Sequence, residues 1–359
     1  MPSENTRRSL VRSIATLSVV SASGCLDTSG DKRSPTRSRD PSVRWFASVD
    51  SHVSDVRTAN GRIYASTPFA IYALDSTDGS EDWSVELYEP SDVTCFEGAF
   101  APTTGSVYLG DCRRLRAVGA ERGGDRWSVG DRASVYAPAV GDGVYYADGT
   151  VHALDAGDGS VRWSVEADGA AAWRPALVDG MVVAGSTDGR LRAFDAGSGA
   201  RRWTTEVGAR TAAPTAADGT VYVGGSADDE GFVAAVNAAD GRTVWRSATP
   251  PVKSAGFVGT APTVVSDTVF VPFDDGTVRA LRRDDGSERW RYGAETPLSW
   301  PASDGGLFVG TGDGLVVLDP AEGSERHRYE TRYPVDAIAP TDDAVAVGTG
   351  DEVQVFDRP

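Results

Sequence analysis

The sequence predicts an all-β protein, an eight-bladed β-propeller built of four-stranded antiparallel blades. Three observations predict this fold. A short motif recurs along the 359 residues, each copy places a small residue ten positions before an aromatic one, and the two ends of the chain hold complementary parts of one further copy. A seven-bladed ring is the alternative, if one weak copy is absorbed elsewhere.

The recurring motif is a β-hairpin. Residues 151–165 read VHALDAGDGSVRWSV, in which Val151–Leu154 alternate as a strand does. Asp158 and Gly159 supply the turn, because glycine adopts positive φ without strain. Trp163 then lies on the outgoing strand. Similar stretches stand at residues 72–85, 191–205 and 278–292.

The interval between the small residue and the aromatic is constant, although successive tryptophans lie 36 to 45 residues apart. A fixed interval inside a variable one indicates a rigid local unit, with the changes of length in loops. The small residue leaves room for the ring to lie against its neighbour. The pairs are Ala73 with Trp83, Ala117 with Trp127, Ala153 with Trp163, Ala193 with Trp203, Ala235 with Trp245, Ala280 with Trp290, and Val317 with His327.

Two further strands precede each hairpin. Residues 138–148, PAVGDGVYYAD, show a strand, a glycine-containing turn and a second strand. Four antiparallel strands in 36 to 45 residues are typical of a propeller blade. Prolines recur where the first strand is expected to start, a position that proline tolerates. They are Pro102, Pro138, Pro175, Pro214, Pro262, Pro301 and Pro340.

The two ends of the chain complete each other. Residues 335–357 contain three strands and stop before any docking tryptophan, whereas residues 43–46, VRWF, supply Trp45 with no strand before it. The N-terminal strand should therefore complete the last blade, closing the ring and hiding two sheet edges. Seven blades and one split blade make eight.

The pattern ALDxxxGxxxW resembles the quinoprotein-type, or pyrroloquinoline-quinone-like, propeller repeat, over residues 43–359. Non-enzymatic members, including the lipoprotein propeller of bacterial outer-membrane assembly, imply a protein-binding scaffold. Other members imply a quinone-dependent dehydrogenase that oxidises an alcohol or sugar with calcium as Lewis acid. In those, adjacent cysteines cap the quinone and a Glu/Asn/Asp set holds calcium. Here Cys95 and Cys112 lie 17 residues apart and no such set can be matched, so we expect no cofactor and leave the enzyme as the alternative.

The net charge of −17, with lysine at Lys32 and Lys253 alone, disfavours nucleic acid as a partner. It resembles the surfaces of proteins from halophilic archaea, since concentrated salt screens repulsion between carboxylates. A GC-rich genome that favours arginine codons is the alternative. We expect a monomer that binds an unidentified protein or a small ligand.

The N-terminus indicates export. Residues 1–25 combine Arg7 and Arg8 with a short apolar run, and resemble a twin-arginine signal; the following ASGC resembles a lipobox that would lipidate Cys25. Ala22 departs from that box, and a plain signal peptide is the alternative. Residues 26–42 are almost devoid of apolar side chains and predict a flexible tether. The propeller would then be held at the outer face of the cell membrane.

Residues that depart from the repeat are the candidate site. Trp173 and Trp300 stand just before first strands, near the expected mouth of the central channel, with Arg174, Arg210 and Lys253 in comparable loops. Aromatic and cationic side chains there could hold an anionic or aromatic ligand. Alternatively, the tryptophans plug the channel and the arginines pair with aspartates.

Cys95 and Cys112 fall in loops that open on the same face, and could form a disulfide after export; two free buried thiols are the alternative. His327 stands in a tryptophan's place and is expected to pack as one. His52 and His152 lack partners at metal-ligand spacing, and the aspartate-rich turns lack the twelve-residue spacing of a calcium hand. We expect no metal.

Overall fold

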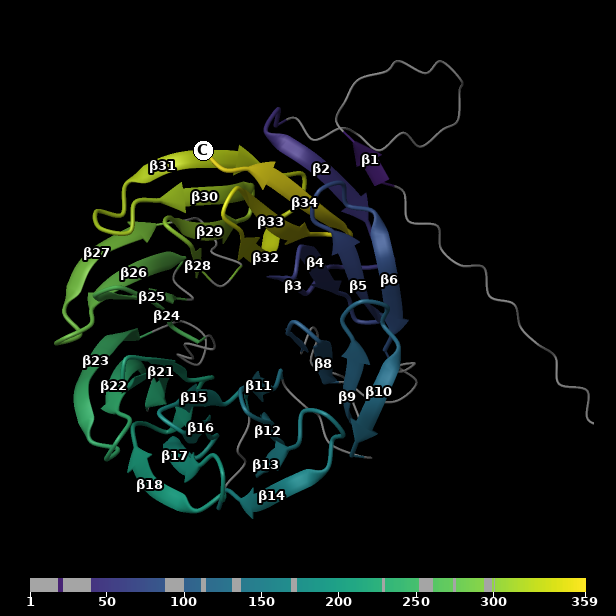
Figure 1. Cartoon of the computed structure of the whole chain (residues 1–359). Coiled ribbons are helices and arrows are strands. Elements are labelled where there is room, and N and C mark those ends of the chain that lie inside the picture. Colours follow the sequence, from purple (N-terminus) through teal and green to yellow (C-terminus); the bar gives the residue numbers. More distant parts are fainter. Residues whose placement is uncertain are drawn as a thin grey trace, which may run out of the picture.

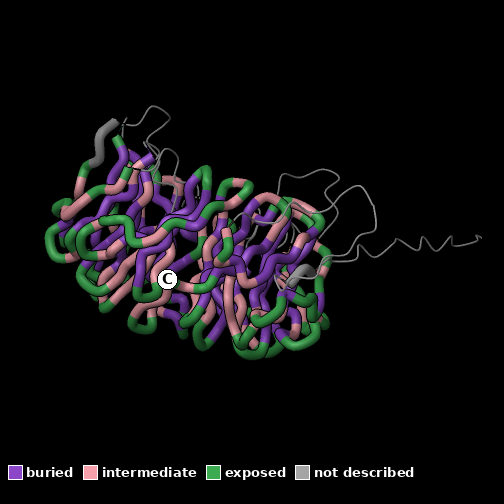
Figure 2. Tube along the Cα trace, turned by 90° about the horizontal axis from the view of Figure 1, so that it is seen from above, coloured by how far each residue is buried: buried purple, intermediate pink, exposed green. Residues whose placement is uncertain are grey.

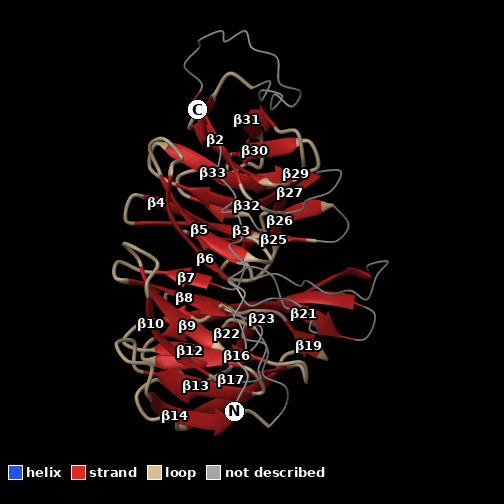
Figure 3. Cartoon of the chain, turned by 90° about the vertical axis from the view of Figure 1, so that its right-hand side faces the viewer, coloured by secondary structure: helices blue, strands red, loops and turns tan. Residues whose placement is uncertain are grey.

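The computed structural model describes residues 19–21, 40–87, 100–110, 114–130, 137–168, 173–227, 230–251, 261–273, 276–293, 299 and 301–359. Every helix-or-strand element among them is a β-strand, and the strands form eight sheets arranged in a ring (Figures 1 and 3). The eight-bladed prediction is therefore confirmed, and the seven-bladed alternative is wrong. Within the described ranges, no helix has the length and apolar character needed to cross a bilayer.

Each blade runs from its innermost strand, A, to its outermost strand, D. Blade 1 holds β3 (Asp55–Ala59), β4 (Arg62–Ser66), β5 (Ala70–Asp75) and β6 (Glu81–Glu86). Blade 2 holds β7 (Phe100–Pro102), β8 (Ser106–Gly110), β9 (Leu115–Gly119) and β10 (Asp125–Val129). Blade 3 holds β11 (Ala139–Val140), β12 (Val144–Ala147), β13 (Thr150–Leu154) and β14 (Val161–Glu166). Blade 4 holds β15 (Ala176–Val178), β16 (Met181–Gly185), β17 (Arg190–Asp195) and β18 (Arg201–Glu206).

The second half of the ring repeats this order, with two additions. Blade 5 holds β20 (Thr215–Ala217), β21 (Thr220–Ala227), β22 (Glu230–Asn237) and β23 (Thr243–Pro251), and β19 (Arg210–Thr211) also pairs with β21. Blade 6 holds β24 (Thr263–Val265), β25 (Thr268–Pro272), β26 (Thr277–Arg282) and β27 (Glu288–Gly293). Blade 7 holds β28 (Ala302–Ser303), β29 (Leu307–Thr311), β30 (Gly314–Leu318) and β31 (Glu325–Glu330). Blade 8 holds β32 (Val335–Pro340), β33 (Ala344–Thr349), β34 (Glu352–Asp357) and β2 (Val43–Ser48), with β1 (Val19–Ser21) beside β2.

The C–D hairpin explains the constant interval of ten. In blade 3, Ala153 pairs directly across from Trp163, and the register shifts just after that pair, toward the turn. Asp155 Oδ1 accepts a hydrogen bond from the Gly157 amide at 2.8 Å, which holds the turn. The other small residues and their aromatic partners are paired in the same way.

The recurring prolines divide into two groups. Five of them immediately precede an A strand, as expected from the missing amide donor. Pro102 and Pro340 instead are the last residues of β7 and β32. In those two blades the proline ends the innermost strand, so the prediction that it stands at the start of the strand was wrong there.

Blade 8 is closed by the N-terminal strand, as predicted. β2 pairs antiparallel with β34, and Trp45 stands opposite Val355 in the register of the other blades. Figure 1 shows β2 and the C-terminal strand β34 side by side in this sheet. Glu330 N donates to Asp40 Oδ2 at 3.2 Å, so Asp40, inside the segment expected to be a tether, contacts the ring. Residues 22–39 lie outside the described part.

The core is divided among the interfaces between blades. The described residues form eight apolar clusters, and each cluster joins two successive blades around the ring. Buried residues accordingly follow the sheets and exposed residues follow the turns (Figure 2). No blade covers both of its own faces; each is covered by its neighbours.

Tryptophans of the D strands dock each blade on the next. Each indole Nε1 donates to a main-chain carbonyl in or beside the C–D turn of the following blade, at 2.6–3.2 Å. The donors are Trp45, Trp83, Trp127, Trp163, Trp203, Trp245 and Trp290.

His327 does not make the equivalent hydrogen bond among the described residues. Its ring packs edge-on against Tyr329, with 4.4 Å between ring centres, and the Tyr329 hydroxyl donates to the Asp357 carbonyl at 2.7 Å. Blade 8 has no continuous C–D turn, because its outer strand comes from the N-terminus. Tyr329 therefore supplies a side-chain hydrogen bond from blade 7 to blade 8 in place of the tryptophan, within the apolar cluster that joins the two blades.

Candidate functional site

Three charged side chains near the ring axis form one cluster, the axial cluster of Asp55, Arg57 and Arg174. Strand β3 places Asp55 and Arg57 on one face, because they are two residues apart. Arg57 Nε donates to Asp55 Oδ2 at 2.8 Å, and its guanidinium lies 5.4 Å from the centre of the Phe100 ring. Arg57 is thus fixed by a carboxylate and by an aromatic face.

Arg174 approaches this pair from the connection between blades 3 and 4. Its side chain reaches solvent, yet protein surrounds the guanidinium closely enough that burial, assisted by the positive charge of Arg57, lowers its pKa to about 10. The Asp55 carboxylate acts in the opposite direction. Arg174 makes no hydrogen bond or ion pair within the described part of the chain that would replace its lost hydration.

Burial also disfavours the charged form of Asp55, which is an anion where Arg174 is a cation. Burial raises the pKa of Asp55, although the charges of Arg57 and Arg174 and a hydrogen bond from Arg57 lower it. Two guanidiniums accompany one carboxylate in the axial cluster. The cluster can therefore attract an anion.

Blade 8 contributes a further pair near the axis. His52 Nε2 lies 3.6 Å from Asp336 Oδ2, and Asp336 belongs to the innermost strand β32. Burial raises the pKa of Asp336, against the opposing influence of His52. Neither residue has the partners of a metal site: the described residues hold no group of three or more His, Cys, Asp or Glu side chains placed to bind an ion.

Of the predicted site residues, Trp173, Arg174 and Arg210 are described. Trp173 immediately precedes Arg174 and has a φ of 89°, a left-handed value that is strained for a non-glycine residue. Arg210 lies exposed on β19. Lys253, Trp300, Cys95, Cys112, Cys25, Arg7 and Arg8 lie outside the described residues.

Sequence reasoning missed Asp55 and Arg57, although a signal was present. Arg57 pairs with Tyr64 of strand B, at a position where five other blades place an alanine and the remaining two a threonine. A charged residue in a column of small ones indicates a special role. It becomes visible only after the A and B strands have been aligned.

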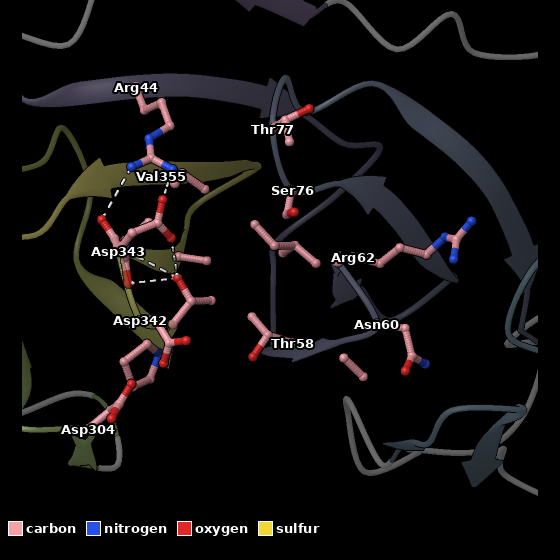
Figure 4. Close-up of a pocket in the computed structure, with 17 residues that line it drawn as sticks. Arg44, Thr58, Asn60, Arg62, Ser76, Thr77, Asp304, Asp342, Asp343 and Val355 are labelled. Carbon is pink, nitrogen blue, oxygen red and sulfur yellow. Dashed lines mark hydrogen bonds and ion pairs between the residues drawn. The ribbon is translucent and has the colours of Figure 1, made fainter.

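A second feature, the seam hollow, lies between blade 8 and blade 1 and has a volume of about 450 Å³. In Figure 4, Asp342, Asp343 and Val355 of blade 8 face Thr58, Asn60 and Arg62 of blade 1. Small aliphatic side chains also contribute to the lining, namely Ala59, Ile63, Ala344 and Ala346. The hollow thus combines an apolar component with a polar rim. It opens among A–B and C–D turns, which antiparallel succession places on the same face of the ring.

The charges at the rim of the seam hollow are largely paired. Arg44 donates to Asp343 at 2.9 Å and to Asp357 at 2.7 Å. Burial opposes the charge of Arg44, but these two hydrogen bonds outweigh it and raise the pKa of Arg44. The Arg44 hydrogen bond in turn lowers the pKa of Asp343. These hydrogen bonds reduce the net charge at the rim. They also hold β2, the N-terminal strand of blade 8, to the C-terminal part of the chain.

The quinoprotein alternative can be tested against these groups. A quinone site with calcium needs a cluster of oxygen donors and a cysteine cap. The described residues hold no such cluster, and both candidate cysteines lie outside them. No catalytic step is assigned to the described residues.

Comparison with known proteins places part of this sequence. Residues 147–299 match the family model described as outer membrane protein assembly factor BamB. BamB of Shewanella oneidensis is 32% identical over 105 residues, which are 27% of this chain and 25% of that protein. The serine/threonine-protein kinase AfsK of Streptomyces griseus is 36% identical over 124 residues, 32% of this chain and 15% of the kinase. The matches thus span a quarter or less of these relatives.

Solved structures share the fold. The crystal structure of BamB from Moraxella catarrhalis superposes with a TM-score of 0.68 at 22% identity, covering 87% of this chain and 100% of that one. A quinohemoprotein alcohol dehydrogenase from Pseudomonas putida superposes with a TM-score of 0.64 at 16% identity, covering 87% and 76%. The chain is therefore an eight-bladed β-propeller, and its residues 147–299 carry BamB-like repeats.

Proposed function

We propose that this chain is a protein-binding scaffold, an exported propeller that presents its turn-bearing faces to a partner protein. The observation that carries the proposal is the BamB match over residues 147–299 in an eight-bladed ring. The name of that family refers to a factor that assembles outer membrane proteins, and such work requires contact with other proteins. A propeller suits such work because its rigid ring displays many loops on two faces.

We further propose that the propeller is held outside the cell by a lipid. The support is in the sequence: Arg7 and Arg8 precede an apolar run, Cys25 follows small residues, and residues 26–42 offer a polar tether. Replacement of Cys25 by serine is expected to release the protein from the membrane, because a thioether to lipid can no longer form. Immunoblots of membrane and medium fractions measure this. A Cys25→Ser protein that stays in the membrane would contradict the lipid anchor, and Cys95→Ser is the matched control.

Site-specific photo-cross-linking in the native cell tests the scaffold. A photoreactive amino acid at Thr77 samples the face of the A–B and C–D turns, and one at Ala209 samples a connection between blades on the other face; both positions are exposed. The proposal predicts one dominant protein adduct from at least one position. Absence of any protein adduct from both positions, with the variants normally expressed and folded, would overturn it.

A second candidate, capture of a small anionic ligand, is favoured by the axial cluster. Arg174 is surrounded by protein close to Arg57, with Trp173 beside it in sequence. An anion there would relieve the repulsion between two guanidiniums. Replacement of Trp173 and Trp300 by alanine separates the candidates: ligand capture would be lost, whereas a partner that binds the turns would cross-link as before.

A further inference from the structure

A three-residue row crosses the strands of every blade. A residue of strand B pairs with the small residue of strand C, which pairs with the docking residue of strand D. In six blades the B-strand member is a tyrosine or phenylalanine. These residues are Tyr64, Tyr108, Tyr145, Tyr222, Phe270 and Phe308.

The B-strand ring fills the space between its own tryptophan and the next blade. Five of the rings lie 5.6–6.1 Å from the tryptophan of their row, measured between ring centres. In blade 2 the Tyr108 hydroxyl donates to the Ala156 carbonyl at 3.2 Å, and Trp127 Nε1 donates to the same oxygen at 3.1 Å. In blade 3 Trp163 Nε1 donates to the Ala196 carbonyl at 2.8 Å, whereas the Tyr145 hydroxyl lies 3.4 Å from that oxygen and donates to Asp142 Oδ1 at 2.6 Å. In blade 2 a phenol and an indole thus use one turn carbonyl together.

Two blades lack the ring, and they differ in what replaces it. Blade 4 has Val183, and Met181 of the same strand packs against the same apolar cluster. Blade 8 has Ala346, with Ala344 at the corresponding earlier position. Two methyl groups cannot fill the volume of a phenol ring. Ala344, Ala346 and Val355 all line the seam hollow, so the hollow lies where the ring is missing.

We propose that the seam hollow is an aromatic socket, which receives a tyrosine or phenylalanine side chain from the partner protein. This inference rests on the proposed function and names the site of docking. We infer an aromatic occupant because the equivalent position in six other blades holds a tyrosine or phenylalanine ring. The hydrogen-bond acceptor is also present: Trp45 Nε1 donates to the Ser76 carbonyl at 3.1 Å, and Ser76 lines the hollow. A carbonyl oxygen has a second lone pair for a phenol.

The size and rim of the hollow favour a protein side chain over a free phenol. Its volume of about 450 Å³ exceeds that of one ring, which leaves room for the residues that flank the ring. Thr58, Asn60 and Thr77 place polar groups at the rim, where they can bond the main chain of an inserted loop.

A hollow between blades 5 and 6 shows the contrast. It has a volume of about 460 Å³, and there Tyr222 is in place and accepts a hydrogen bond from Arg283 Nε at 2.8 Å. Its lining includes Arg282, Arg289 and Asp267 in place of small aliphatic residues. That row already contains its ring, so the hollow there is not an aromatic socket.

Titration with p-cresol, the side-chain analogue of tyrosine, tests the socket in the full chain. Methyl NMR should show the signals of Ala346 and Val355 shifting together, saturating at one site with a Kd on the order of 1 mM or tighter. Ala346→Tyr places the missing ring in the socket and should abolish these shifts. Ala346→Leu, a smaller change that tests the same point if tyrosine disturbs folding, should weaken binding at least tenfold. Asp218→Asn, in the exposed A–B turn of blade 5 and outside the hollow, should leave the affinity within a factor of two.

Equal p-cresol binding by the wild type and by both Ala346 variants would overturn the socket, as would the absence of any shift at Ala346 and Val355. The cross-linked partner then separates this inference from the proposed function. Affinity for that partner should fall at least tenfold in Ala346→Tyr. Undiminished affinity would refute docking at the socket and leave the scaffold standing, whereas a wild-type chain that captures no protein would refute the scaffold itself.

Discussion

The C–D turn glycine of blades 1 to 7 is required by a contact as well as by its backbone conformation. Gly199 has a φ of 72°, and a Cβ added to it would lie 2.8 Å from Cδ2 of Trp163 in the preceding blade. A side chain at this position must therefore displace the docking indole. The glycine that the repeat pattern places in these turns therefore packs directly against the tryptophan ring of the preceding blade.

Gly199→Ala is expected to lower the free energy of unfolding by about 2–4 kcal/mol, from left-handed strain and overpacking together. Gly180→Ala is the matched control. Its φ is also 72°, but nothing lies within 4 Å of an added Cβ, so it should cost only about 1 kcal/mol. Urea denaturation of both variants measures the difference. Equal losses would show that the contact with Trp163 has no energetic weight.

Among the arginine–carboxylate ion pairs of blade 4, the pair of Asp188 with Arg192 is the most buried. Arg192 is 3% exposed and donates to both oxygens of Asp188, at 3.1 and 2.6 Å. This hydrogen bonding lowers the pKa of Asp188 from 3.8 to about 2, against the opposing influence of burial. A depressed pKa means that the pair stabilises the fold fully above pH 3.8 and loses its contribution as the pH falls through about 2.

Asp188→Asn is expected to cost about 1–3 kcal/mol at pH 7, because the buried guanidinium loses a charged acceptor. The gap from the wild type should stay constant down to about pH 5 and shrink between about pH 4 and pH 2. Denaturation midpoints across this range measure it. Asp218→Asn is the control: its carboxylate is 84% exposed in the pair with Arg283, and its loss should cost less than about 1 kcal/mol. A gap as wide at pH 2.5 as at pH 7 would contradict the assignment.

Residue patterns within one hairpin could be read from the sequence, whereas patterns across several strands could not. The pairs of a small residue with tryptophan lie at constant spacing within each hairpin, so Ala153 and Trp163 could be matched from their spacing alone. The row that includes Ala346 joins strands B, C and D, and its meaning depends on register. The same holds for Arg57, which departs from a column of small residues only when the A and B strands are aligned.

At the scale of elements, the split blade is where the chain order of the repeat is broken. β34 and β2 meet without a covalent turn, so the docking hydrogen bond that a tryptophan makes elsewhere passes to Tyr329. The sequence predicted closure because the two ends held complementary strands. It did not predict the role of Tyr329. The repeat marks only the docking position, where His327 stands, whereas the hydrogen bond to blade 8 is made two residues further along the strand.

Removal of residues 1–48 is expected to lower the thermal midpoint sharply, because it deletes β2 and exposes the edge of β34. Trp45 is 1% exposed, and loss of a buried tryptophan alone costs about 3–5 kcal/mol. Removal of residues 1–39 is the control and should change the midpoint little, because the contact of Asp40 and all of β2 remain. Differential scanning calorimetry measures both. A truncation at 48 that melts like the truncation at 39 would contradict closure by β2.

At the scale of the whole molecule, the acidic surface should make stability depend on salt. A net charge of −17 repels itself at low ionic strength, and the Debye length falls from about 10 Å at 0.1 M to about 3 Å at 1 M. The melting midpoint should therefore rise between about 0.1 and 2 M potassium chloride at pH 7. The same series near pH 4.6, the pI of the sequence, is the control, because little net charge remains to be screened. A flat or falling curve at pH 7 would refute adaptation to salt.

The ring form explains why the fold was easier to predict than the function. Each blade needs only its neighbours, so the repeat carries the architecture through all eight interfaces. The two candidate sites are departures from that repeat: the axial cluster adds charge where small residues prevail, and the seam hollow omits a ring. Each departure occurs in one blade only, so no repetition along the sequence points to it.

The most direct measurement of the central claim is to purify the protein from its native membrane at high salt, after mild cross-linking, and to determine by mass spectrometry what is bound. The scaffold account predicts a partner protein whose cross-linked peptides lie on the turns of this ring. A bound quinone with calcium, and no protein partner, would contradict it and make oxidation of an alcohol or sugar the function to pursue.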